Sequence, residues 1–153
     1  MEHTEQHSTM STRPFGFSHL ARRPRLPSLE TQTVAFVELA RAQCKRRMVS
    51  MWLRWNGFEV YLRYSPRYIA GNVSIGEVLV IANIEVPKKY QHRGWFWHYL
   101  RLCSALTVGG IVVESVHTQY LYDALSKRQE FIEFEEKSFL LKSDRALKMP
   151  QGG

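Results

Sequence analysis

The stretch "IEVPKKYQHRGWF", residues 84–96, joins the end of an apolar strand to the start of an aromatic-rich helix. Between them stand Pro87, two lysines and the tetrapeptide Gln-His-Arg-Gly. The start of a helix exposes unpaired backbone N–H groups and the positive end of the helix dipole. Gly94 allows the backbone to approach a ligand closely, and the basic side chains add positive charge nearby. The turn therefore predicts an anion-binding site, with an unoccupied basic loop before a helix as the alternative.

The patterns on either side of this turn predict a mixed α/β domain, with antiparallel strands first and one central strand–helix–strand crossover. Asn56-Gly57 joins two β-rich runs and predicts a hairpin, because this dipeptide accepts positive φ angles. The run "EVLVIANIEV" (77–86) is long and mostly apolar and predicts a central strand. Residues 65–76, with one proline and two glycines, are expected to be strand ends and loop. The other expected elements are a helix at 30–47, a helix from Phe96 to the Gly109-Gly110 pair, a strand at 111–116, a helix at 120–129, and short strands at 131–134 and 138–141.

The chain has 153 residues, which fits a single domain. We expect a flexible basic N-terminal extension at 1–28, a folded domain at 29–145 and a C-terminal tail at 146–153. The net charge is +7, and the excess of Lys and Arg lies in the N-terminal two-thirds of the chain. This imbalance favours an anionic partner, such as nucleic acid, an acidic protein or a phosphate-bearing cofactor. A solvated surface with no dedicated partner is the alternative.

The cysteines and histidines do not form a metal-binding pattern. Cys44 and Cys103 are far apart, and the six histidines have no zinc-type spacing. Free thiols in a reducing compartment and no metal are therefore expected. No apolar run approaches the roughly 20 residues that span a bilayer, and no apolar stretch of signal-peptide type is present at the N-terminus. These features predict a cytoplasmic protein that does not interact with a membrane.

Residues 86–96, "VPKKYQHRGWF", resemble the pyrophosphate-binding signature of the GNAT superfamily of N-acetyltransferases. That signature is a strand, then Gln/Arg-x-x-Gly-x-Gly/Ala, then a helix. Gln91 and Gly94 match it, whereas Phe96 stands where the family has Gly or Ala. The expected element order agrees with the family over roughly residues 30–142. The resemblance implies a GNAT-like acyl-CoA N-acyltransferase fold.

The resemblance also implies an acetyl-CoA site on both sides of this turn. The end of the long strand would bond the pantetheine arm through its backbone, and the amides after it would hold the pyrophosphate. The implied cofactor-binding residues are Ile84, Glu85 and Val86 on the strand, and Gln91, His92, Arg93, Gly94, Trp95 and Phe96 in the turn and helix.

Acetyl transfer needs a neutral amine, a polarised thioester carbonyl and often an acid for the leaving thiolate. Glu114 resembles the glutamate that several family members carry at the matching strand, which implies a general base. Glu85 and Glu77 on the preceding strand are the other candidates. The alternatives are that Glu85 only faces solvent and that Glu77 only ends a loop.

The acid is less clearly indicated. Many family members follow this strand with Asn and place a Tyr on the next helix, shortly before Gly-Phe. Here those positions fall on Thr118 or Gln119, on Ser126, and on Glu130. Serine is a poor proton donor, so Tyr122, one turn earlier on the same face, becomes the candidate acid. Ordinary packing is the alternative role for Tyr122.

Aromatic residues alternate with arginines along the predicted hairpin. If displayed, they suit a protein interface or nucleic-acid stacking; if buried, they belong to the core. The residues are Trp52, Trp55, Tyr61, Tyr64 and Tyr68, with Arg54, Arg63 and Arg67 between them.

The sequence therefore predicts an acetyl-CoA-dependent N-acetyltransferase that modifies an amine of a macromolecule. Charge favours an acidic protein surface or RNA as the partner. The alternative is a catalytically weak or silent GNAT-fold module that grips a protein or nucleic acid through its basic, aromatic surface. Direct nucleic-acid binding alone has only charge and aromatic content in its favour, because no such motif is present. A homodimer also remains open.

Overall fold

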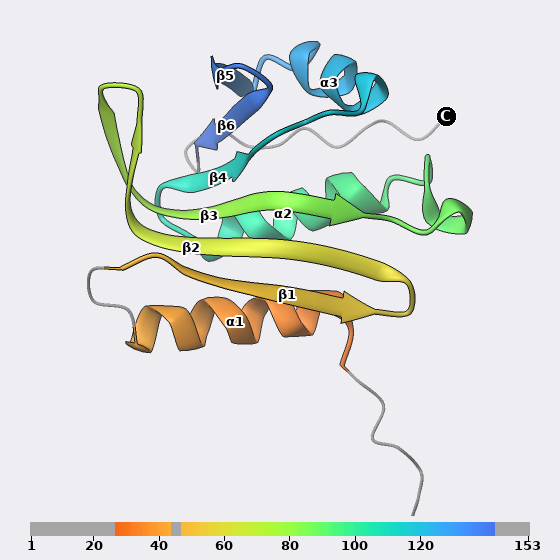
Figure 1. Ribbon diagram of the computed structural model, residues 1–153, viewed down its shortest axis with the longest axis horizontal. Helices are drawn as coiled ribbons and strands as arrows, with labels where there is room; N and C mark the ends of the chain where they lie inside the picture. The colour runs from red at the N-terminus through yellow and green to blue at the C-terminus, as the bar shows by residue number, and fades with distance from the viewer. Residues whose placement is uncertain (1–26, 44–46, 143–153) are drawn as a thin grey trace, which may run out of the picture.

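The described residues form one six-stranded mixed sheet with three α-helices, as Figure 1 shows. The structure, a computed structural model, describes residues 27–43 and 47–142. The expected terminal tail, all but two residues of the expected N-terminal extension, and Cys44 lie outside this range. The elements are α1 (Leu29–Gln43), β1 (Val49–Trp55), β2 (Phe58–Ala70), β3 (Val73–Glu85), a 3₁₀ turn (Lys88–Tyr90), α2 (Trp95–Leu106), β4 (Gly110–Val113), α3 (Gln119–Ser126), β5 (Phe131–Glu135) and β6 (Ser138–Lys142).

The strands lie in the order β1-β2-β3-β4-β6-β5. β3 and β4 are parallel and are joined through α2, which confirms the predicted crossover. The other neighbouring pairs are antiparallel. Asn56 and Gly57 take positive φ angles of 47° and 85° and close the β1–β2 hairpin, as predicted.

The prediction of strand ends and loop at residues 65–76 is right only in part, because the loop is limited to residues 71–72. β2 runs on to Ala70 and β3 begins at Val73, so this stretch forms a hairpin that extends beyond the rest of the sheet (Figure 1). Pro66 lies within a register shift between Ser65 and Tyr68, where no regular ladder bond is needed from its missing N–H. The proline and the glycines are therefore accommodated by irregular pairing instead of ending the strand.

The main core lies between the sheet and the helices. α1 and α2 contact each other and pack on one face of the sheet, and Leu125 of α3 joins the same core. Tyr99 and Phe58 are among its largest buried side chains. The opposite face of the sheet, the second face, carries a smaller core around Val80 and Val112. The hairpin between β2 and β3 contributes Tyr68 to this smaller core. The Tyr68 ring meets that of Phe134 edge-on, with ring centroids 6.3 Å apart.

β3 contains a bulge that changes which of its side chains face the helices. Leu62 of β2 pairs with Ile81, but the preceding residue, Tyr61, pairs with Asn83, so Ala82 is an extra residue. Before the bulge, Ile81 faces the main core; after it, Ile84 does, although strict alternation would send it to the second face. The end of β3 therefore presents apolar side chains to the helix side.

The opposite end of the β3–β4 pair is tightly anchored. A Cβ on Gly110 would overlap the carbonyl oxygen of Leu141, so only glycine allows this approach of β4 to β6. Nearby, the Glu77 carboxylate accepts hydrogen bonds from Arg41 Nε at 2.7 Å, Tyr64 Oη at 2.7 Å and the Val108 amide at 3.0 Å. Glu77 thus ties α1, β2 and the α2–β4 loop to β3.

Replacement of Gly110 should destabilise the fold far more than replacement of another glycine with positive φ. Gly71 also has a positive φ, but a Cβ there meets no atom within 4 Å. We expect Gly71→Ala to cost about 1 kcal/mol for backbone strain, and Gly110→Ala to cost about 3 kcal/mol or more because a clash is added. Urea unfolding of both variants tests this, and equal losses would contradict the proposed close approach.

Stability should depend on pH through Glu77. Burial alone would raise the pKa of this carboxyl, but the hydrogen bonds from Arg41, Tyr64 and Val108 outweigh it and lower the pKa below 4.5. A lowered folded-state pKa gives stability that is present above pH 4.5 and is lost as the pH falls through the folded value. We expect Glu77→Gln to lower the free energy of unfolding by about 1–2 kcal/mol at neutral pH. The variant should also lack the further decrease in stability that the parent shows in acid.

Tyr64→Phe serves as the matched variant, because it removes one donor to Glu77 and keeps the ring. It should weaken the acid dependence without abolishing it. Urea unfolding at neutral pH and at successive acidic pH values measures all three proteins. The same acid dependence in the parent and in Glu77→Gln would rule out this role for Glu77.

Candidate functional site

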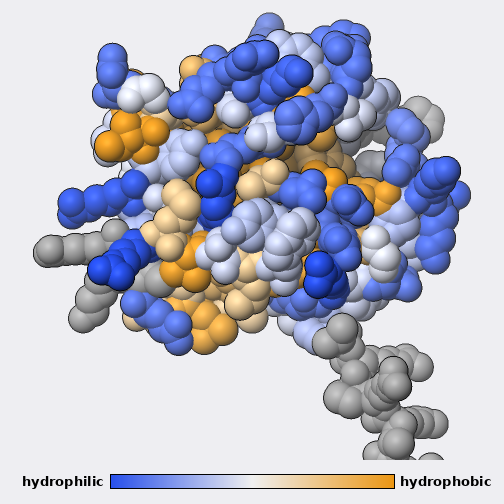
Figure 2. Space-filling view, viewed as in Figure 1, coloured by the Kyte–Doolittle hydropathy of each residue, from blue (hydrophilic) through white to orange (hydrophobic). Residues whose placement is uncertain are grey.

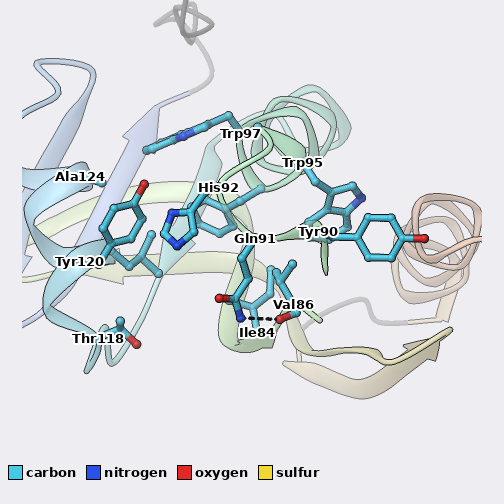
Figure 3. Close-up of a pocket in the computed structure, with 13 residues that line it drawn as sticks. Ile84, Val86, Tyr90, Gln91, His92, Trp95, Trp97, Thr118, Tyr120 and Ala124 are labelled. Atoms are coloured by element: carbon cyan, nitrogen blue, oxygen red, sulfur yellow. Dashed lines mark hydrogen bonds between the residues drawn. The ribbon is translucent and has the colours of Figure 1, made fainter. Parts of the chain in front are cut away.

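A cavity of about 260 Å³ opens between the end of β3, the turn before α2, and α3 (Figure 3). Most of the residues that the sequence suggested for the cofactor line it, and α3 supplies the opposite wall. The lining residues are Ile84, Val86, Tyr90, Gln91, His92, Gly94, Trp95, Phe96, Trp97, Thr118, Tyr120, Leu121 and Ala124. Of the suggested cofactor residues, Glu85 and Arg93 are not part of the lining.

The turn presents free backbone donors to this cavity. The first hydrogen bond of α2 runs from the His98 amide to the Gly94 carbonyl at 3.2 Å. No residue in the described range accepts a hydrogen bond from the amides of Trp95, Phe96 or Trp97, as expected for a first helical turn. His92 and Gly94 have φ angles of 57° and 79°, a left-handed geometry that turns successive amides toward one side.

The shape of the turn is held by a side chain of the turn itself. Gln91 Nε2 donates to the Val86 carbonyl at 2.8 Å, which closes the loop between the strand and the helix (Figure 3). Lys88, Lys89 and Arg93 are exposed around it and have no ion pair with any described residue. The turn is therefore held by this hydrogen bond and carries positive charge without a described ion pair beside its free amides.

Aromatic rings pack against one another beneath the turn. Trp95 lies 4.5 Å from Phe58 and 4.9 Å from Tyr99 by ring centroids, and its Nε1 donates to Glu30 Oε1 at 3.0 Å. The Tyr99 and Thr33 hydroxyls are 2.8 Å apart and buried. Because these contacts join α1, β2 and α2, the start of α2 is fixed against the sheet and the donors keep their direction.

His92 and Tyr120 meet at the cavity from opposite sides. Their rings touch edge-on with centroids 4.6 Å apart, and Figure 3 shows them side by side between the turn and α3. Both residues are exposed. Phe96, at the position where the GNAT signature has Gly or Ala, lines the cavity as well and also packs against the main core.

The suggested catalytic carboxylates lie outside this cavity. Glu85 is exposed. It lies beyond the bulge, between Ile84 and Val86, which face the main core, so its side chain points to the opposite side of the sheet. Glu114 comes directly after β4; its amide donates to the Ile81 carbonyl, and its carboxylate forms an ion pair with Arg63. Both carboxylates therefore lie on the second face, near the point where β3 and β4 part. Glu77, the third candidate, is occupied by its structural contacts.

The structure does not bring Tyr122 into the cavity. Its hydroxyl donates to both oxygens of Glu133, at 3.2 and 3.0 Å, and its ring packs against Phe139. The hydrogen bond to Glu133 raises the pKa of Tyr122, which makes it a weaker acid. Ser126, at the position where the family has Tyr, donates its hydroxyl to the Tyr122 carbonyl at 2.8 Å. Neither hydroxyl is directed at the cavity.

Sequence reasoning did not identify the α3 wall. The cavity is lined there by Thr118, just before α3, and by Tyr120, Leu121 and Ala124 of α3, which are a polar, an aromatic, an apolar and a small residue without a shared motif. The available signal was helical spacing: Tyr120 and Ala124 are four residues apart and so share one face of the helix. Placing that face against the turn required the tertiary arrangement.

The described residues also bear on the expectations for thiols, metal sites and membrane spans. Burial raises the pKa of Cys103 to about 12, so this thiol is protonated at neutral pH. Residues 27–43 and 47–142 contain no cluster of His, Cys, Asp and Glu that could hold a metal ion. None of the helices in that range combines the length and the apolar character needed to cross a bilayer.

Comparisons with known proteins do not assign a family. No protein-family model matches the chain, and no curated protein or solved structure matches it. The GNAT resemblance of residues 86–96 therefore stays a prediction from the motif.

Proposed function

We propose that this protein is a GNAT-like acyltransferase that binds acetyl-CoA in the cavity before α2 and transfers the acetyl group to an amine. The observation that carries the proposal is the set of free amides at Trp95, Phe96 and Trp97, which open into a cavity beside unpaired basic side chains. Such donors favour a diphosphate, because helix N-termini and left-handed turns concentrate positive potential. The volume of about 260 Å³ suits part of the cofactor, with the nucleotide outside.

The arrangement of the strands supports the same proposal. β3 and β4 pair only from Val78–Gly110 to Ile81–Val113, and β3 then continues to Glu85. Beyond Ile81, the backbone on the β4 side of β3 has no strand partner within the described residues. A pantetheine arm contains amide groups that can bond this exposed backbone as an added strand would. Its thiol end would then point toward the gap between the two strands.

Acetyl transfer would take place at this gap. The amine nitrogen forms a bond to the thioester carbon, the carbon–sulfur bond breaks, the amine loses a proton and the thiolate gains one. Glu114 and Glu85, on the second face beside the gap, are the candidate groups to receive the amine proton. Arg63 orients the Glu114 carboxylate, because the two side chains form an ion pair.

Charge at the turn should control cofactor binding. Gly94 has a positive φ, which Asn and Asp both tolerate, and a Cβ there meets no atom within 4 Å. We expect Gly94→Asp to weaken coenzyme A binding about tenfold or more, because a carboxylate would repel the diphosphate. Gly94→Asn, with the same shape and no charge, should bind nearly as the parent does. Calorimetric titration with coenzyme A measures all three; no binding to the parent would refute the site.

A silent binding module is the second candidate function. The specific observation in its favour is that the cavity lining contains no Asp or Glu, and that Tyr122 is bonded to Glu133 outside it. In this case the cofactor would bind and no acetyl group would be transferred. The long hairpin and the second face would then serve to hold a partner.

Replacement of the two carboxylates separates these functions. If Glu114 is the base, Glu114→Gln should lower acetyl transfer by a factor of about 100 or more, while coenzyme A binding is kept. Glu85→Gln is the matched variant, on the same face and at the same gap. Transfer from labelled acetyl-CoA to cell extract is the measurement. Unchanged transfer in both variants would remove both residues from the mechanism, and no transfer by the parent would favour the silent module.

A further inference from the structure

Large apolar side chains are exposed along β1 and the adjoining side of α1. Met48, Met51 and Trp52 are 49%, 45% and 44% exposed, and Leu39 of α1 is 55% exposed. Figure 2 shows hydrophobic side chains at the lower left of the view, over α1 and β1, among hydrophilic ones. Gln32 and Leu39 are seven residues apart, which places them on one stripe of the helix. Since Gln32 reaches the Arg54 carbonyl at 3.0 Å, this stripe runs along the outer edge of β1.

β1 is an edge strand with open backbone groups. Residues of an antiparallel strand alternate between those that bond the neighbouring strand and those that face away from it. The carbonyl of Arg54 faces away from β2, because Gln32 bonds it, so Trp52 and Ser50 face away as well. No hydrogen bond joins their backbone groups to another described segment. β1 has no proline or lysine to protect it, although proteins commonly protect such edges.

The open groups are self-complementary about Met51. If two copies of β1 pair antiparallel around a two-fold axis at this residue, Ser50 of each copy faces Trp52 of the other. All four N–H and C=O groups of these two residues in each chain are then bonded, and the Gln32–Arg54 bond stays intact. Arg54 faces Met48 across the axis, so no like charges meet, and its own charge is paired with Glu59 at 2.8 Å.

The side chains match this register on both faces. Met51 points to the helix side, as Leu53 does, and would meet its own copy next to Leu39. Trp52 points to the second face, where its ring lies 4.9 Å from that of Tyr61, and it would cover the small Ser50 of the other copy. The pairing thus buries the exposed apolar side chains together with the open edge.

We infer that the protein forms a symmetric dimer through antiparallel pairing of β1 with β1 of a second copy, centred on Met51. The two sheets then continue edge to edge. The contact is one strand wide, so its dissociation constant should be on the order of micromolar. The inference is independent of the cofactor site, which lies on the other side of β3.

Cross-linking at the two-fold axis tests the register directly. Residues that face each other without backbone hydrogen bonds have Cα atoms about 4.5 Å apart, which a disulfide spans. In a Cys44→Ser background, where the other thiol is the buried Cys103, Met51→Cys should oxidise to a covalent dimer. Ile69→Cys is the matched control, since Ile69 is 65% exposed and lies at the far hairpin. It should form no covalent dimer under the same conditions.

Sedimentation of the full chain over a range of concentrations gives a second measurement. The parent should associate, Met51→Lys should remain monomeric because two ammonium groups would meet at the axis, and Ile69→Lys should associate as the parent does. Circular dichroism confirms that each variant is folded. A parent that stays monomeric at high concentration, or an Ile69→Cys variant that cross-links as fast as Met51→Cys, would overturn the inference.

Discussion

The bulge at Ala82 shifts the side-chain alternation of β3 by one residue, just where β3 loses β4 as its neighbour. The cavity depends on this shift. With a regular strand, Asn83 and Glu85 would face the helices and Ile84 would face the second face. A carboxylate would then stand beside the free amides of α2 and compete with an anion for them. The bulge instead places Ile84 in the cavity lining and keeps Glu85 out of it, so no carboxylate of the lining competes for the amides.

The separation of β3 from β4 is stable because the two strands are fixed at their other end. Gly110 permits the close approach of β4 to β6, and Glu77 connects β3 to α1 and to the loop before β4. The packing of Trp95 against Phe58 and Tyr99 fixes the start of α2 in the same way. The site therefore lies between two rigid anchors, so its donors are directed before any ligand arrives. Preorganised donors bind anions without a further ordering cost.

The element order, the hairpin at Asn56-Gly57 and the crossover could be predicted, because each depends on local patterns. The bulge could not, since residues 78–82 are all apolar and the alternation of polar and apolar residues begins only at Asn83, so no change of phase is visible. The extension of β2 through Pro66 was missed because proline usually ends a strand, and only the shifted pairing with β3 accommodates it. For the site, the motif drew attention to a turn that lines the cavity, and its role in cofactor binding stays a prediction. The direction of the Tyr122 side chain depends on Glu133 of β5, which spacing along α3 cannot reveal.

The proposed function places binding and chemistry on opposite faces of one sheet. The cofactor would enter from the helix side, whereas Glu85 and Glu114 lie on the second face, next to the gap beyond Ile81 and Val113. An amine that approached over the second face would meet these carboxylates before it met the thioester, which is the order that deprotonation requires. Around the gap, Glu59, Glu85 and Glu114 outnumber Arg54 and Arg63 on this face. Glu59 and Glu114 are each paired with one of these arginines, so Glu85 is the carboxylate of the three that has no ion pair with a described residue and could attract a cationic amine.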